Sequence, residues 1–103
     1  MEYLVKLTDR AFRDMRAIYG FIGAESSESA LAWFGELTET IESLGAYPER
    51  GTTIPKMKNV RRLLFGSKPN VYGIGYFVDR KNKIVRVLHI RHGARRALAS
   101  ERT

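Results

Sequence analysis

Cysteine is absent from the 103-residue sequence. Its absence excludes disulfides, thiolate metal sites and a cysteine nucleophile, and is typical of proteins of the reducing cytoplasm. Long apolar runs are also missing, since the longest nearly unbroken one, Val71 to Val78, is less than half of a membrane span. The first residues, MEYLVKL, contain an acid and only a short apolar stretch, so we expect no secretory leader. These features predict a cytoplasmic protein without a membrane segment, folded as a single domain over residues 1–103.

Acidic residues are scarce in the second half of the chain. The whole sequence has 18 Lys and Arg against 11 Asp and Glu, a net charge of +7. From Met1 to Tyr47 the net charge is −4, whereas from Pro48 to Thr103 it is +11. This asymmetry predicts a basic surface for an anionic partner, which could be RNA, DNA or an acidic protein. The alternative is a solvated basic surface without a partner.

The first half of the chain has the pattern of a short strand and two amphipathic helices. Residues 2–7 alternate as a strand does, and Thr8 stands where a helix N-cap would. One apolar stripe then runs to Gly23, and a second begins after Ser26 or Ser27 and ends near Gly45. The short linker predicts an antiparallel helical hairpin. The predicted core positions on the two stripes are Phe12, Met15, Ile18, Trp33, Phe34, Leu37 and Ile41.

After Tyr47 the sequence changes to a loop followed by strands. The segment YPERGTTIP contains helix-breaking residues and predicts a loop. Strand-like runs follow at residues 60–65, 71–78 and 84–90, and residues 94–101 could form a short C-terminal helix. The expected fold class is therefore α+β, in the order β-α-α-β-β-β, with the helical hairpin packed on one face of a mainly antiparallel sheet. The basic residues would occupy the opposite face and the strand ends.

The run VLHIRHGARR, residues 87–96, is the first candidate for chemistry. Histidine is suited to proton transfer near neutral pH, and arginine donates to phosphate in a planar fork. Strand alternation places His89 and Arg91 on one face and His92 on the other. Arg95 and Arg96 follow the predicted strand end at Gly93. The alternative is that His92 is a structural residue bonded to backbone at the strand end.

The segment PKMKNVRRLLFG is the second candidate. Lys56, Lys58, Arg61 and Arg62 make a basic entry into a strand, which is typical of binding loops or of a strand edge protected by lysine. No metal site or cofactor is expected, because histidines three residues apart on a strand point to opposite faces. Gly73-x-Gly75 lies inside a strand with no helix after it, so it does not indicate dinucleotide binding.

The segments YPERG, RRLLFG, VYGIGYFVD and VLHIRHGARR, in this order, resemble the RelE/ParE superfamily of type II toxin–antitoxin toxins. The resemblance covers nearly the whole chain. It implies a small cytoplasmic toxin that is bound and neutralised by a cognate antitoxin in a hetero-oligomer. In this superfamily RelE-like members cut mRNA at the ribosome without metal, whereas ParE-like members are implicated in poisoning DNA gyrase. The strand end His-Gly-Ala-Arg resembles the ParE-like branch.

The resemblance also assigns roles to single residues. His92 matches a catalytic histidine of some ribosome-dependent members, Arg62 lies near a basic strand position, and Lys56 and Lys58 resemble a lysine pair of RelE. Gly73 stands where the ribonucleases usually have arginine, and Arg96 stands where ParE-like members often have aspartate.

We therefore favour a gyrase-binding toxin over a ribonuclease. Its antitoxin- or target-binding residues would be Lys56, Lys58, Arg61, Arg62, Arg91, Arg95 and Arg96. If the chain is instead an mRNA endoribonuclease, His92, Arg62, Arg91 and Arg95 would be catalytic, with Tyr72, Tyr76 or Glu49 as the second proton-transfer group. A non-toxic basic module that binds nucleic acid is a third interpretation.

Overall fold

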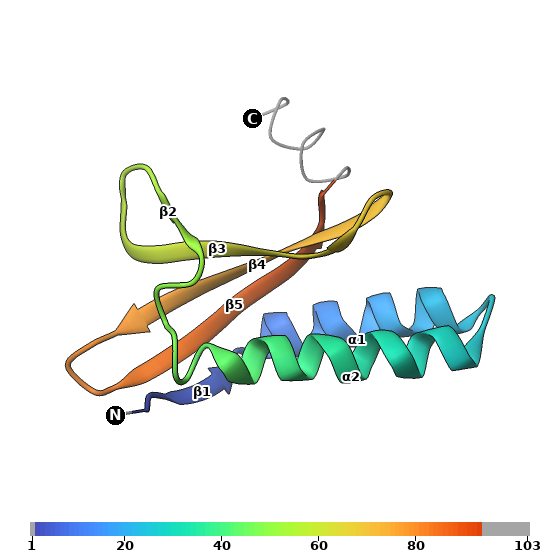
Figure 1. Cartoon of the computed structure of the whole chain (residues 1–103), viewed down its shortest axis with the longest axis horizontal. Coiled ribbons are helices and arrows are strands. Elements are labelled where there is room, and N and C mark those ends of the chain that lie inside the picture. Colours follow the sequence, from blue (N-terminus) through green and yellow to red (C-terminus); the bar gives the residue numbers. More distant parts are fainter. Residues whose placement is uncertain (1, 94–103) are drawn as a thin grey trace.

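The computed structural model describes residues 2–93 and contains two helices and five strands (Figure 1). Both helices begin close to the predicted residues, and the three long strands extend beyond the predicted runs. The elements in chain order are β1 Leu4–Leu7, α1 Asp9–Gly23, α2 Ser27–Ser43, β2 Thr52–Ile54, β3 Met57–Ser67, β4 Asn70–Asp79 and β5 Ile84–His92.

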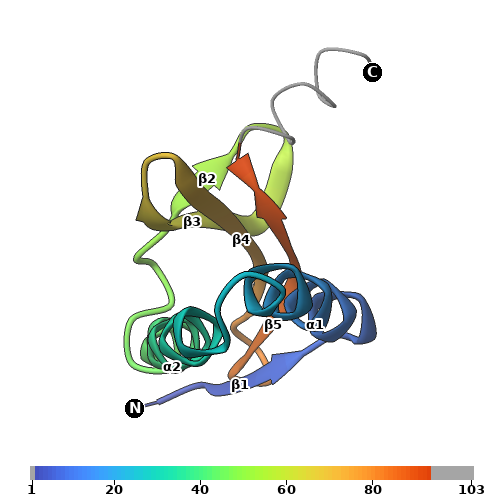
Figure 2. The ribbon, with the colours of Figure 1, turned by 90° about the vertical axis from the view of Figure 1, so that its right-hand side faces the viewer.

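The strands form one sheet in the order β1-β5-β4-β3-β2. β1 is parallel to β5, and the other neighbours are antiparallel. The helices lie side by side against one face of this sheet, and the other face carries no helix of the described residues (Figures 1 and 2). The predicted α+β fold, with a helical hairpin on one face of a mainly antiparallel sheet, is confirmed. Neither helix is long and apolar enough to cross a membrane.

The sheet includes one short strand that the sequence pattern did not predict. The segment 47–55 is not entirely a loop, because Thr52 and Thr53 pair with Arg62 and Arg61 to form β2. A strand of three residues between Gly51 and Pro55 is too short to show alternation, so the turn-forming residues around it dominate the pattern. The predicted C-terminal helix, residues 94–101, lies outside the described residues.

Both helices begin at the expected capping residues. The Ala11 N–H donates to Thr8 Oγ1 at 3.1 Å, and the Ser29 N–H donates to Ser26 Oγ at 3.1 Å. The Thr8 hydroxyl also donates to the Val87 carbonyl at 2.9 Å, so this cap joins the start of α1 to β5. Each cap satisfies a backbone N–H group that the first helical turn leaves without a partner.

The core lies between the helical hairpin and the covered face of the sheet. Met15, Leu37 and Ile41 are buried as predicted, and Ile18 and Trp33 pack against the core while partly exposed. From the sheet and the end of α2, the core receives Leu44, Tyr72, Ile74, Tyr76, Val78, Val85, Val87 and Ile90.

Phe12 and Phe34 are not core residues, and this part of the prediction is wrong. Their side chains are 48% and 39% exposed. Both lie toward the outside of the hairpin, where the Phe34 ring contacts Tyr19 edge-on at 5.9 Å and the Arg16 guanidinium lies 5.8 Å from the Phe12 ring. The helical stripe is wider than the surface that the sheet can cover, so its outer edge stays accessible.

A β-bulge in β5 sets the orientation of the strand end. Gly75 pairs with His89, whereas Tyr76 pairs with Val87, so Leu88 is an extra residue on β5. The bulge shifts the alternation by one position. As a result Val87 and Ile90, three residues apart, are both buried against the helices. The bulge thereby decides which side of the sheet each histidine occupies.

Candidate functional site

The sheet surface opposite the helices, which we name the open face, carries a compact set of basic side chains. Arg62 of β3 pairs with Gly75 of β4, which in turn pairs with His89 of β5. Two residues before Gly75 on β4, Gly73 pairs with Arg91. Directly paired residues project on the same side of an antiparallel sheet, so Arg62, His89 and Arg91 share the open face.

Two glycines make room for these side chains. A Cβ atom on Gly75 would lie only 2.6 Å from Nε2 of His89, and a Cβ atom on Gly73 would lie 3.3 Å from Cδ of Arg62. Both glycines are buried although they belong to the open face, because the side chains of Arg62 and His89 lie over them. The pair Gly73-x-Gly75 thus forms a shallow trough that lets a ring and an arginine stem lie flat on the sheet.

His92 lies on the other side of the sheet, toward the helices. It pairs with Tyr72, whose ring it contacts edge-on with centroids 5.1 Å apart. Its Nδ1 atom is buried and has no hydrogen-bond partner among residues 2–93. Beside the two rings lies a cleft of about 430 Å³ that Ala17, Ile18, Phe21 and Asn70 also line.

The residues predicted for catalysis are therefore not all brought together. Arg62 and Arg91 share the open face, His92 lies behind the sheet, and Arg95 and Arg96 lie outside the described residues. The histidine that does lie with the two arginines is His89, which was not among the predicted site residues. Strand alternation and the glycine pair opposite it were the signals that could have identified it.

The four basic residues predicted around the start of β3 are also not brought together in one place. Lys56 lies in the turn between β2 and β3 with a positive φ of 68°, and Lys58 is exposed on β3. Arg61 points to the helix side, where its Nη1 donates to the carbonyl of Gly51 at 2.7 Å. Arg61 thus holds the YPERG loop, whereas Arg62 is on the open face.

The YPERG loop is also tied to the buried Tyr76. The Tyr76 hydroxyl donates to the Pro48 carbonyl at 2.8 Å and accepts from the Gly51 N–H at 2.9 Å. Burial raises the pKa of Tyr76 above its ordinary value of 10.0, although the hydrogen bond from Gly51 acts in the opposite direction. A phenol held neutral in this way is a poor proton acceptor near neutral pH.

The remaining candidates for proton transfer also lie away from the open face. Tyr72 is buried on the helix side, and the carboxylate of Glu49 is paired with Arg80 at 3.0 Å beside the loop. Within residues 2–93 no group of three or more His, Cys, Asp or Glu side chains is placed to hold a metal ion. On the open face Arg62, His89 and Arg91 therefore present two guanidinium groups and one imidazole. The carboxylate described on this face, Asp79, lies at the last residue of β4 and is paired with Arg86.

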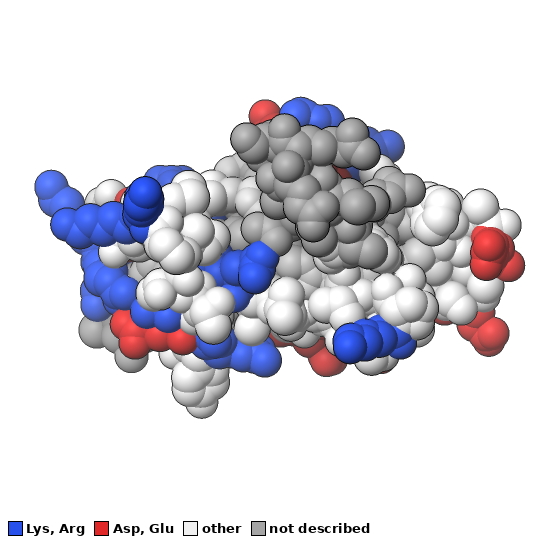
Figure 3. All heavy atoms as spheres, turned by 90° about the horizontal axis from the view of Figure 1, so that it is seen from above, with Lys and Arg blue, Asp and Glu red and all other residues white. Residues whose placement is uncertain are grey.

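Charge is distributed unevenly over the whole surface. Seen from above, on the side away from the helices, Lys and Arg gather over the half of the molecule that holds the β2–β3 and β4–β5 turns (Figure 3). Acidic side chains mark the opposite end, where α1 and α2 join (Figure 3). The basic turns contain Lys56, Arg80, Lys81 and Lys83, and Lys58 follows at the start of β3.

Comparison with known proteins relates this architecture to a toxin family. A family model described as ParE toxin of type II toxin-antitoxin system, parDE, matches residues 5–97. No curated protein sequence is significantly similar to the chain.

Several solved structures share the fold. A chain of the chromosomal ParDE system from P. aeruginosa has a TM-score of 0.70 and 22% identity, covering 88% of this chain and 96% of that one. A mutant of the E. coli toxin RelE in the free state has a TM-score of 0.64 and 18% identity, covering 98% and 94%. A chain of a RelBE toxin–antitoxin complex from Mycobacterium tuberculosis has a TM-score of 0.57 and 21% identity, covering 89% and 99%. At these identities the likeness shows a common fold.

Proposed function

Because the chain belongs to the ParE toxin family of type II toxin–antitoxin systems, we propose that it inhibits growth in the cytoplasm by binding DNA gyrase. A cognate antitoxin neutralises it in a hetero-oligomer. The observation that carries this proposal is the division of the predicted catalytic groups. Arg62 and Arg91 lie on the open face, whereas His92 lies on the helix side of the sheet.

The separation of the two arginines from His92 by the sheet favours binding over RNA cleavage for a chemical reason. Attack by a 2′-hydroxyl needs a proton acceptor, a proton donor and charge stabilisation on one surface. Gly73 offers no side chain where the ribonucleases usually have arginine, and Tyr72 and Tyr76 are buried behind the sheet. A protein that inhibits by binding needs only a surface of suitable shape and charge, which Arg62 and Arg91 contribute.

A second candidate function has one specific observation in its favour. His89 lies beside Arg62 and Arg91 on the open face, so one imidazole and two guanidinium groups share that surface. If a second proton-transfer group is supplied by the ribosome or by residues outside 2–93, this set could support metal-independent cleavage of mRNA. In that case His89, and not His92, would be the histidine that acts on the RNA.

Two reactions run in parallel separate these functions. The purified chain is incubated with ribosomes and a defined mRNA, and separately with gyrase and supercoiled plasmid. The variants are Arg62→Ala, Arg91→Ala, His89→Ala and His92→Ala, and Lys81→Ala in the β4–β5 turn is the control for loss of one positive charge. We expect gyrase inhibition without RNA cleavage, weakened by Arg62→Ala and Arg91→Ala and unchanged by Lys81→Ala.

The other outcomes are equally informative. Codon-phased mRNA cleavage that disappears in His89→Ala would replace the gyrase proposal with the ribonuclease. Cleavage that disappears only in His92→Ala would show that the helix-side cleft is the active site. Steeply salt-dependent binding to nucleic acid alone, with no effect in either reaction, would identify a non-toxic basic module.

The antitoxin proposal is supported by the charge of the chain. The half from Pro48 onward has a net charge of +11, which an acidic and partly disordered segment could cover. The M. tuberculosis structure with this fold is a toxin–antitoxin complex. Co-expression with the small gene adjacent to this one should restore growth and yield a stable complex. Harmless overexpression of the intact folded chain, or the absence of an adjacent small gene, would contradict the proposal.

A further inference from the structure

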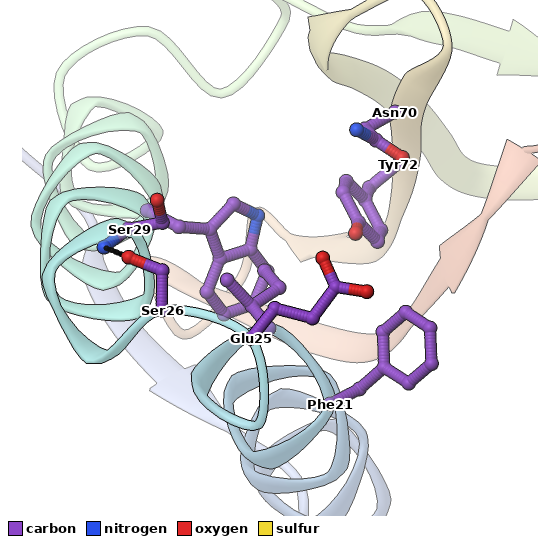
Figure 4. Close-up of a pocket in the computed structure, with 8 residues that line it drawn as sticks. Phe21, Glu25, Ser26, Ser29, Asn70 and Tyr72 are labelled. Atoms are coloured by element: carbon purple, nitrogen blue, oxygen red, sulfur yellow. Dashed lines mark hydrogen bonds between the residues drawn. The ribbon is translucent and has the colours of Figure 1, made fainter.

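A second cleft lies at the acidic end of the molecule, remote from the basic turns. It has a volume of about 490 Å³ and opens between the α1–α2 connection and the start of β4. Its lining includes the side chains of Phe21, Glu25, Ser29, Trp33, Asn70 and Tyr72 (Figure 4). Phe21, Asn70 and Tyr72 also line the cleft that leads to His92, so the two spaces adjoin.

Aromatic rings flank the carboxylate of one exposed residue, Glu25, in this cleft. Glu25 extends from the helix connection toward Tyr72, and the Phe21 ring lies on the other side of its carboxylate (Figure 4). Trp33 contacts Tyr72 edge-on with ring centroids 5.6 Å apart. The Phe21 side chain is 70% exposed, which is unusual for a phenylalanine and leaves its face accessible to a ligand.

The electrostatics of the cleft favour a cation. The Glu25 carboxylate forms no ion pair within residues 2–93, whose ion pairs are Arg10–Asp14, Arg80–Glu49 and Arg86–Asp79. The negative end of α1 and the positive end of α2 meet at this connection, so the two helix dipoles offset each other. The formal charge of Glu25 then decides the sign of the local field.

We propose that this cleft binds a lysine or arginine side chain presented by a segment of a partner protein. Aromatic faces attract an organic cation through their quadrupoles, and a carboxylate among them adds direct charge pairing. The cleft, at about 490 Å³, is large enough for the apolar stem of such a side chain as well as for its charged head. The stem would pack against the aromatic rings, so a side chain carried by a peptide fits the cleft better than a small free cation does.

The test uses the fluorescence of Trp33, the single tryptophan of the chain. Three probes are titrated into the purified protein: a capped Gly-Arg-Gly peptide, the same peptide with citrulline in place of arginine, and methylguanidinium. Citrulline keeps the shape of arginine and removes its charge. The variants are Glu25→Gln and Phe21→Ala, and Glu28→Gln is the matched control, because Glu28 is exposed in the first turn of α2 and does not line the cleft.

We expect a saturable change in Trp33 emission with the arginine peptide and binding weakened roughly fivefold or more in Glu25→Gln and in Phe21→Ala. Glu28→Gln should bind as the wild type does. Equal binding of the citrulline peptide, or equal loss in Glu25→Gln and Glu28→Gln, would overturn the proposal. Methylguanidinium binding as tightly as the peptide would overturn the assignment of a protein segment as the occupant. Because these titrations involve neither gyrase nor ribosomes, their failure is distinct from a failure of the proposed function.

Discussion

At Gly75 one missing methyl group allows the His89 ring to lie flat on the open face. In Gly75→Ala the new Cβ would meet Nε2 of His89 at 2.6 Å, so the ring must move. The ring ends a flexible side chain, so we expect the fold to lose only about 1 kcal/mol of stability. Binding that depends on the open face should weaken, as measured by gyrase inhibition together with the NMR signals of His89.

The control for this variant is Gly35→Ala in α2. A Cβ at Gly35 has no heavy atom within 4 Å, and alanine favours a helix over glycine by about 1 kcal/mol. Gly35→Ala should therefore stabilise the protein and leave inhibition unchanged. An unaltered His89 signal and full inhibition in Gly75→Ala would contradict the role given to the glycine trough.

Tyr76 connects the YPERG loop to the sheet, and its substitution should be visible in stability and in the pH dependence of stability. Tyr76→Phe loses the hydrogen bonds to Pro48 and Gly51 and should cost about 1–3 kcal/mol. The folded protein holds the Tyr76 proton to a higher pH than the unfolded chain, because burial raises its pKa above 10.0. This contribution is complete below pH 10.0 and is lost as the pH rises through the folded pKa.

Urea denaturation of wild type and Tyr76→Phe at pH 8 and above pH 10.0 measures both effects. Other tyrosines and lysines titrate in the same alkaline range in both proteins, so the difference between the two isolates Tyr76. The stability gap between wild type and variant should narrow as the pH rises. A gap that stays constant would show that Tyr76 does not change its pKa on folding.

The positions of single site residues were only partly predictable from the sequence. Alternation gave the opposite orientations of His89 and His92, because side chains on a strand alternate whatever the tertiary structure is. Alternation could not show which of the two histidines faces the helices, because that depends on the bulge at Leu88 and on the pairing of β5 with β4. The hydrogen bond from Arg61 to the loop could not be predicted either. Its partner Gly51 is ten residues earlier, in a segment without periodicity.

At the scale of elements, the start of α1 is coupled to the sheet and the start of α2 is not. The Thr8 hydroxyl accepts from the Ala11 N–H and donates to the Val87 carbonyl, whereas Ser26 in the described structure only accepts from Ser29. Thr8→Ala should therefore cost about 1.5–2 kcal/mol and Ser26→Ala about 0.5–1 kcal/mol. Chemical denaturation of both variants checks the order, which equal costs would contradict.

The two sides of the helical hairpin should differ in their response to truncation. Leu37 is fully buried against the sheet, so Leu37→Ala leaves a cavity and should cost about 2–5 kcal/mol. Phe12 is 48% exposed on the outer side, so Phe12→Ala should cost about half as much or less. Urea midpoints of the two variants measure this contrast. A loss of stability in Phe12→Ala equal to that in Leu37→Ala would place Phe12 in the core, as the helical stripe alone had predicted.

Which elements form was more predictable than how wide their buried faces are. The caps at Thr8 and Ser26 and the apolar stripes are local signals, and both helices begin where these signals are. How much of each helical stripe is buried depends on the width of the sheet. That width is set by all five strands together, so it cannot be read from one helix. β2 was not predictable from its three residues, because its existence depends on its pairing with Arg61 and Arg62.

At the scale of the whole molecule, the charge asymmetry of the sequence becomes a separation in space. The acidic helical hairpin turns at one end, and the basic strand turns lie at the other (Figure 3). An extended partner segment with acidic and basic parts could contact both ends at once, which multiplies two weak contacts into a stronger one. The open face and the cleft at Glu25 would then be two contact regions for one chain.

The basic residues that follow Pro48 should also influence the rate at which an acidic antitoxin associates with the protein. Opposite charges accelerate encounter, and salt screens them over a Debye length of about 8 Å at physiological ionic strength. Arg62→Gln with Arg91→Gln should slow association at low salt and flatten its salt dependence, with a smaller effect on dissociation. Arg10→Gln with Arg13→Gln on α1 removes the same charge from the other layer of the fold. Stopped-flow measurement of both double variants distinguishes local steering from net charge, since equal slowing would mean that the open face has no special part in recognition.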